Sequence, residues 1–152
     1  MEKKLKISVV TVVFNGEKTL EKTIQSVINQ TYENIEYLII DGGSSDSTVD
    51  IIKKYESKIS FWKSEADKGI YDAMNKGLVQ ATGDFIIFLG ADDLFVDREV
   101  VQNFVKKICC DSYDYIYYGN VIKTSNYAIY DGFFSKEKIA IRNICHQPLK
   151  RL

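Results

Sequence analysis

Polar side chains follow three apolar segments of this 152-residue chain, at or shortly after the point where each segment ends. Asn15 follows the segment Ile7–Phe14, Asp41 follows Ile35–Ile40, and the adjacent residues Asp92 and Asp93 follow Phe85–Leu89. Two adjacent carboxylates repel each other unless a cation or hydrogen-bond donors lie nearby. Their hard oxygen atoms suit Mg²⁺ or Mn²⁺, which also take phosphate oxygens of a substrate as ligands. By itself, such a pair is more often an ordinary loop that precedes a helix.

The second cluster, Asp41-Gly42-Gly43-Ser44, combines a carboxylate with two glycines. Glycine lets a ligand approach the backbone closely, and the helix that follows could offer N–H groups to an anion. The aspartate could accept hydrogen bonds from a base or a ribose. A turn with helix-capping residues is the simpler alternative, because the segment matches neither the dinucleotide nor the P-loop pattern.

Other candidate residues carry weaker signals. Phe14 could stack on a nucleobase from the end of its segment, although a core aromatic residue is the simpler interpretation. Lys68 belongs to a polar run that a solvated surface would explain. His146 is the only histidine, and three cysteines without a C-x-x-C pair favour free thiols over a disulfide framework or a zinc site.

The order of the segments predicts the fold. Apolar runs at Ile7–Phe14, Ile35–Ile40, Ile59–Trp62 and Phe85–Leu89 indicate buried strands, and amphipathic stretches between them, including Ile70–Ala81, indicate helices. Less regular runs at Tyr113–Tyr118 and Tyr127–Tyr130 indicate later strands. Alternating strands and helices predict a mostly parallel α/β sheet. Because ligands of such sheets bind at the carboxyl ends of the strands, the three polar clusters should share one crevice.

Composition limits the class of protein. The chain is 45% hydrophobic and 27% charged, as expected of one soluble globular domain over residues 1–152. Its formal net charge of -1 argues against nucleic acid as a partner. No apolar run approaches the roughly 18 residues that span a membrane. We therefore expect a cytoplasmic protein, compatible with a peripheral position at the inner face of the membrane.

Four stretches together resemble glycosyltransferase family 2, whose members have the GT-A fold, a Rossmann-like and mostly parallel sheet flanked by helices. They are ISVVTVVFNG, QTYENIEYLIIDGGSSDST, SEADKGIYDAMNKG and ATGDFIIFLGADD, in the order and approximate spacing of the family. The resemblance runs from Ile7 to about Gln147. It implies transfer of a sugar, with inversion, from a nucleotide-diphospho-sugar donor that is typically UDP-linked to a glycan or lipid-linked acceptor, in polysaccharide or glycoconjugate biosynthesis.

The resemblance also implies roles for individual residues. Phe14, with Asn15 beside it, falls where the family often packs an aromatic ring on the base, and Asp41 falls where an aspartate binds the base. Asp92 and Asp93 match the D-x-D-like motif, in which the first residue faces the ribose or metal and the second coordinates Mg²⁺ or Mn²⁺. The segment that contains Lys68 and Asn75 often lines the donor site.

The match departs from the family at a few places. Met74 stands where many relatives have arginine. Relatives usually continue well past His146-Gln147, into a region that holds the catalytic aspartate and much of the acceptor site, so we expect this chain to stop before the catalytic base. Asp131 and His146 are weak substitutes. An alternative is therefore a donor-binding remnant without transferase activity, and a third reading is a nucleotidyltransferase, which would need a glycine-rich basic loop after the first strand.

Overall fold

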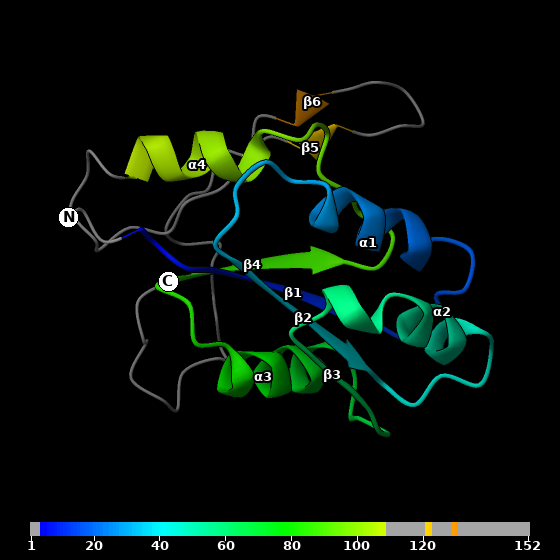
Figure 1. The fold of residues 1–152 in the computed structure, drawn as a ribbon. Helices are drawn as coiled ribbons and strands as arrows, with labels where there is room; N and C mark the ends of the chain where they lie inside the picture. Colours follow the sequence, from blue (N-terminus) through cyan, green and yellow to red (C-terminus); the bar gives the residue numbers. More distant parts are fainter. Residues whose placement is uncertain (1–3, 109–120, 123–128, 131–152) are drawn as a thin grey trace. The chain divides into compact units, whose positions relative to one another are not determined.

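The computed structural model describes residues 4–108, 121–122 and 129–130. Contacts divide the chain into two units, residues 1–111 and residues 112–152. The first unit contains β1 (Ile7–Val13), α1 (Leu20–Ile28), β2 (Ile35–Asp41), α2 (Thr48–Lys54), a 3₁₀ turn (Glu56–Lys58), β3 (Phe61–Ser64), α3 (Ile70–Gln80), β4 (Phe85–Gly90) and α4 (Val100–Ile108) (Figure 1). The second unit contains β5 (Val121–Ile122) and β6 (Ile129–Tyr130), which pair antiparallel.

The first unit is built on a four-stranded sheet in the order β3-β2-β1-β4, in which all neighbouring strands run parallel. All seven residues of β1 are buried, as its valine-rich run predicts for a strand covered on both faces. Helices follow β1, β2, β3 and β4 in turn, so each parallel pair is joined by a crossover. The predicted fold class, a mostly parallel sheet flanked by helices, is confirmed.

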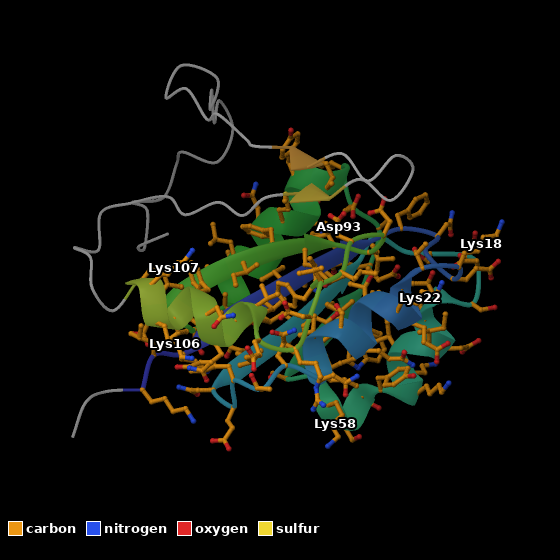
Figure 2. The ribbon with its side chains drawn as sticks, turned by 90° about the horizontal axis from the view of Figure 1, so that it is seen from above. Lys18, Lys22, Lys58, Asp93, Lys106 and Lys107 are labelled. Atoms are coloured by element: carbon orange, nitrogen blue, oxygen red, sulfur yellow. The ribbon has the colours of Figure 1, made fainter. Side chains whose placement is uncertain are left out.

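Helices cover the sheet on both faces. On one face, α3 packs through Ala73 on a cluster formed by Val10, Val12, Leu38 and Ile40. On the other face, α4 packs through Phe104, whose ring lies edge-on to that of Phe85 with centroids 5.9 Å apart. Figure 2 shows α1, α2 and α4 on one side of the strands and α3 on the other. Among the described residues, no helix combines the length and apolarity that a membrane crossing needs.

The amino ends of the strands are joined by the side chain of Glu36. Its carboxylate accepts hydrogen bonds from Lys6 Nζ at 2.7 Å, Ser8 Oγ at 2.6 Å and the backbone N–H of Thr82 at 2.7 Å. Burial alone would raise the pKa of Glu36, but the bonds from Lys6, Ser8 and Thr82 outweigh it and lower the pKa to about 2. One carboxylate thus ties β1, β2 and the connection before β4 together.

Most predicted boundaries agree with the structure to within one residue, and β3 is the exception. It covers Phe61–Ser64 rather than the predicted Ile59–Trp62, because the N–H of Ile59 closes the preceding 3₁₀ turn on the carbonyl of Glu56. Of the two later predicted strands, Tyr127–Tyr130 includes β6, whereas Tyr113–Tyr118 lies outside the described residues. The single-domain boundary at residues 1–152 stays a prediction.

Candidate functional site

The strand register places the three polar clusters at one edge of the sheet. Val13, the last residue of β1, pairs with Asp41 of β2, and the preceding Val12 pairs with Gly90 of β4. The loops that follow β1, β2 and β4 therefore leave the sheet side by side, with the β1 loop in the middle (Figure 1). The edge predicted from the sequence exists.

The β1 loop presents an aromatic ring to solvent and fixes its own backbone. The side chain of Phe14 is 66% exposed, which is unusual for a phenylalanine and leaves its ring available to stack on a ligand. Asn15 has a positive φ of 50°, a conformation that asparagine tolerates better than most residues. Its backbone N–H donates to Ser44 Oγ at 2.7 Å, and its side-chain oxygen accepts from the N–H of Ser45 at 2.9 Å. Asn15 thus holds the β1 and β2 loops together.

Asp41 is completely buried, and its carboxylate is occupied by its own loop. One oxygen accepts the N–H groups of Gly43 at 3.2 Å and Ser44 at 3.0 Å, and also Ser64 Oγ at 2.6 Å. The other oxygen accepts the hydroxyl of Ser44. A carboxylate offers about four acceptor positions. The described contacts therefore give Asp41 a role in shaping the turn, while base binding by this side chain stays a prediction.

The carboxylates of Asp92 and Asp93 converge on the end of β4. A β-carbon built on Gly90 would lie 3.0 Å from an oxygen of Asp92 and 2.9 Å from an oxygen of Asp93, so both side chains turn back over the same glycine. Both residues are exposed. Figure 2 shows Asp93 toward the carboxyl ends of the strands, with Lys106 and Lys107 at the opposite end. Two converging hard oxygens fit a divalent cation that also takes phosphate ligands, although no set of three ligating side chains forms within residues 4–108.

Sequence analysis missed Thr23, which fixes the loop with the two aspartates. Its hydroxyl lies on α1, is 1% exposed, and is 2.9 Å and 2.7 Å from the carbonyl oxygens of Ala91 and Asp93. The sequence pattern that could have identified it is a hydroxyl side chain on the buried face of α1, between Leu20 and Val27. Such a residue needs a hydrogen-bond partner inside the protein.

The β3–α3 loop also reaches this edge. The carbonyl of Asp41 accepts the N–H of Glu65 at 3.0 Å, and Lys76 on α3 clamps the loop by binding Glu65 at 3.1 Å and the carbonyl of Ala66 at 3.2 Å. Burial alone would lower the pKa of Lys76, but its bonds to Glu65 and Asp72 raise it. This loop brings Asp67 against Gly42.

Two predicted residues stay less defined. Lys68 and Asn75 both have exposed side chains, on the β3–α3 loop and on α3. Their contribution to a donor site stays a prediction. Asp131, His146 and the three cysteines lie outside the described residues.

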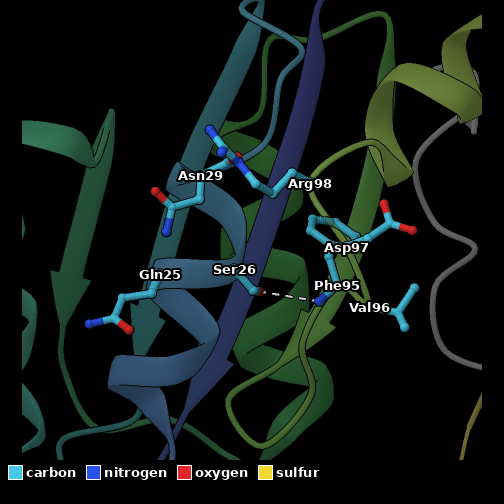
Figure 3. A pocket seen from close by; sticks show the side chains of 7 residues that line it. All are labelled: Gln25, Ser26, Asn29, Phe95, Val96, Asp97 and Arg98. Carbon is cyan, nitrogen blue, oxygen red and sulfur yellow. Dashed lines mark hydrogen bonds between the residues drawn. The ribbon is translucent and has the colours of Figure 1, made fainter.

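Two surface cavities flank α1. One, of about 550 Å³, is lined by Asn15, Gly16, Glu17, Lys18, Thr19, Ser45 and Asp46, and thus opens where the β1 and β2 loops meet. The other, of about 450 Å³, is lined by residues of α1 and by Phe95–Arg98, with the N–H of Phe95 donating to Ser26 (Figure 3). Of the predicted site residues, Asn15 alone lines the first cavity, and none lines the second.

Comparisons with known proteins give one consistent picture. The sequence profile described as Glycosyl transferase family 2 matches residues 8–138. A PGL/p-HBAD biosynthesis glycosyltransferase of Mycobacterium bovis is 32% identical over 146 residues, which are 93% of this chain and 57% of that protein. A cholesterol galactosyltransferase of Borreliella burgdorferi is 36% identical over 76% of this chain and 34% of its own length. The chain thus spans from a third to just over half of these relatives.

Solved structures agree on the fold. A fragment of S. aureus TarS in complex with UDP-GlcNAc superposes with a TM-score of 0.63 at 26% identity, covering 69% of this chain and 31% of that one. A mannosyltransferase of Pyrobaculum calidifontis, solved with GDP-Man and Mn²⁺, gives a TM-score of 0.65 at 22% identity over 70% of this chain and 33% of its own. Both carry a sheet and helices arranged like those of residues 4–108.

Proposed function

This chain belongs to glycosyltransferase family 2, and from that premise we propose that it forms the donor-binding part of a transferase that uses a nucleotide-diphospho-sugar. The nucleotide is uridine diphosphate, and the sugar passes with inversion to a hydroxyl of a glycan or lipid-linked acceptor in polysaccharide or glycoconjugate biosynthesis. The enzyme acts in the cytoplasm or at the inner face of the membrane. The observation that carries the proposal is the convergence of Asp92 and Asp93 beside the loop that exposes Phe14.

The relatives support this choice of substrates. TarS was solved with UDP-GlcNAc, and other relatives are named for transfer to cholesterol or for PGL/p-HBAD biosynthesis. The TarS complex supports a nucleotide-sugar donor, and the cholesterol galactosyltransferase supports a lipid acceptor. The alternative of a nucleotidyltransferase has less support, because the loop after β1 contains a single glycine at Gly16 and no basic cluster that would bind a triphosphate.

The residues divide the work of donor binding. Phe14 offers a ring on which a base can stack, and the carboxylates of Asp92 and Asp93 would hold Mg²⁺ or Mn²⁺. When bound, the cation would neutralise negative charge on the diphosphate leaving group. Thr23 holds the backbone of this loop through the carbonyl oxygens of Ala91 and Asp93. We assign no residue as the base that accepts the proton of the attacking hydroxyl.

Binding of UDP, measured by calorimetry with and without Mn²⁺, tests the donor site. Asp93→Asn should abolish the Mn²⁺-dependent part of UDP binding and leave the thermal unfolding temperature unchanged, because the carboxylate is exposed. Asp50→Asn is the matched control, since Asp50 is an exposed carboxylate on α2, away from β4. Equal Mn²⁺-dependent binding by wild type and Asp93→Asn would refute the metal assignment.

A second measurement separates an enzyme from a protein that only binds the donor. Release of UDP from UDP-sugars is followed with and without candidate acceptors. Acceptor-dependent release supports transfer. Tight, Mn²⁺-dependent UDP binding without release from any UDP-sugar supports a donor-binding function alone.

A further inference from the structure

We infer that Lys76 is a positioning residue of the donor site, which sets the affinity for the nucleotide by holding the β3–α3 loop (residues 65–69) against the turn that follows β2. The inference rests on the proposed function, because it concerns how the loops of the donor site are kept in their binding positions. Lys76 lies on α3, and this role requires no contact between its side chain and the ligand.

The β3–α3 loop has little apolar packing of its own. Ala66, Lys68 and Gly69 are exposed, and Glu65 and Asp67 are partly buried. At the junction with α3, Gly69 has a φ of +111°, and a β-carbon built on it would meet no atom of the described residues within 4 Å, apart from its neighbours in the chain. A segment with few buried apolar contacts opens at a low cost in free energy. The position of this loop therefore depends on polar contacts.

Lys76 supplies three of these contacts from a single ammonium group. Its Nζ lies 3.1 Å from a carboxylate oxygen of Glu65, 3.2 Å from the carbonyl oxygen of Ala66 and 3.4 Å from Oδ2 of Asp72. The same Oδ2 accepts the backbone N–H of Lys68 at 3.2 Å. Because these groups belong to both ends of the loop and to the first turn of α3, one ammonium group joins the loop to the helix.

The loop in turn braces the turn that follows β2. The N–H of Glu65 donates to the carbonyl oxygen of Asp41 at 3.0 Å. The carboxylate of Asp67 lies over Gly42, where an added β-carbon would be 2.5 Å from Oδ2. The loop therefore fills the space next to the turn, and a shift of the loop would remove a backbone hydrogen bond of Asp41.

The turn after β2 holds the β1 loop through Asn15. Ser44 Oγ accepts the backbone N–H of Asn15 at 2.7 Å, and the N–H of Ser45 donates to the side-chain oxygen of Asn15 at 2.9 Å. Hydrogen bonds and close contacts thus connect Lys76 to the loops after β3, β2 and β1. If release of Lys76 lowers the fraction of molecules in which these loops are in place, the apparent affinity for the nucleotide falls in proportion to that fraction.

Calorimetry of UDP binding with and without Mn²⁺ tests the inference. Lys76→Met, which is unbranched like lysine but carries no charge, should weaken UDP binding by about tenfold, as expected if the loops are in place in about a tenth of the molecules. The factor by which Mn²⁺ strengthens UDP binding should keep its wild-type value, because Thr23 holds the loop with Asp92 and Asp93 from α1. Lys76→Arg, which keeps a cation with several donors, should retain most of the wild-type affinity.

Lys63→Met is the matched control. Lys63 Nζ lies 2.7 Å from the other carboxylate oxygen of Glu65, but its side chain is 53% exposed and lies on β3. The substitution therefore removes the same charge without releasing the loop from α3, and UDP affinity should equal that of wild type.

Amide hydrogen exchange provides a second measurement. The N–H of Glu65 should exchange faster in Lys76→Met than in wild type, because the loop that presents it to Asp41 is no longer anchored. The amides of β1, an inner strand of the sheet, should keep their wild-type exchange rates.

The outcomes separate this inference from the proposed function. If wild type binds no UDP, the proposed function fails and the inference fails with it. If wild type binds UDP and Lys76→Met binds it equally well, the function stands and the role of Lys76 is refuted. An equal loss of affinity in Lys63→Met would assign the effect to surface charge, and loss of the Mn²⁺ factor in Lys76→Met would assign it to the metal ligands. Either result would overturn the inference.

Discussion

The hydroxyl of Thr23 lies 2.7 Å from the carbonyl oxygen of Asp93, although 70 residues separate them in the chain. The contact joins the buried face of α1 to the loop that carries both candidate metal ligands. Because the hydroxyl also reaches the carbonyl of Ala91, one donor fixes two peptide groups of that loop. The position of the carboxylates therefore depends on a residue that touches no ligand.

Replacing Thr23 with valine tests this dependence. Valine keeps the shape but removes the donor, so we expect a loss of about 1–2 kcal/mol in the free energy of unfolding and weaker Mn²⁺-dependent UDP binding. Urea unfolding and calorimetry measure the two effects. Thr19→Val is the control, because Thr19 is exposed and its side chain makes no capping bond to α1. Wild-type Mn²⁺ dependence in Thr23→Val would contradict the prediction.

Removal of the Phe14 ring should affect binding and leave stability almost unchanged. The ring is 66% exposed, so Phe14→Ala sacrifices little burial. Loss of stacking should weaken UDP binding by about tenfold, whereas Phe14→Tyr should bind like wild type. Equal UDP affinity of wild type and Phe14→Ala would show that the ring does not contact the base.

Acid should destabilise the protein through Glu36. Its pKa of about 2 in the folded state lies below the ordinary value of 4.5, so its stabilising effect is complete above pH 4.5 and disappears as the pH falls toward 2. We expect the difference in unfolding free energy between wild type and Glu36→Gln to shrink over this range by on the order of 2–3 kcal/mol.

The exposed pair of Glu33 and Lys4 provides the control for that experiment. Their charged groups are also 2.8 Å apart, but the side chains are 85% and 53% exposed, so Glu33→Gln should show little pH-dependent difference from wild type. If the difference in unfolding free energy between wild type and Glu36→Gln stays constant from pH 5 to pH 2.5, the role of Glu36 is disproved.

Gly77 should resist substitution by alanine even though it lies inside α3. Alanine is better than glycine in a helix by about 1 kcal/mol. However, a β-carbon at this position would overlap Cγ1 of buried Val10, and overpacking of a core costs about 1–3 kcal/mol. We therefore expect a net loss of stability in thermal unfolding. The exposed neighbour Val79, replaced by alanine, should be neutral or stabilising.

The sheet could be predicted because its signals are local. Continuous apolar runs such as Ile7–Phe14 are typical of strands buried on both faces, and their order along the chain implies a parallel sheet. The carboxyl edge followed from that topology alone. β3 starts later than predicted because the 3₁₀ turn at Glu56–Lys58, which precedes it, has no apolar period that a sequence pattern reveals.

The hydrogen bonds within the site could not be predicted in this way. Ser64 reaches Asp41 across 23 residues, and Asp67 reaches Gly42 only because two strands end in register. Such partners depend on the exact pairing of strands, which periodicity does not encode. Sequence reasoning therefore found the loops and left open which side chain in each loop faces outward.

The pairing of β1 with both β2 and β4 constrains how the chain can change. Val13 pairs with Asp41 at the end of β2, and Val12 pairs with Gly90 at the end of β4. The register of β1 therefore fixes where the loops after β2 and β4 begin. An insertion of one residue into β1 would turn its buried side chains over and move both flanking loops by one step at once. An insertion within one of these loops, by contrast, changes that loop alone and leaves the strand register intact. New donor preferences are thus easier to obtain by varying loop length than by editing the strand between them.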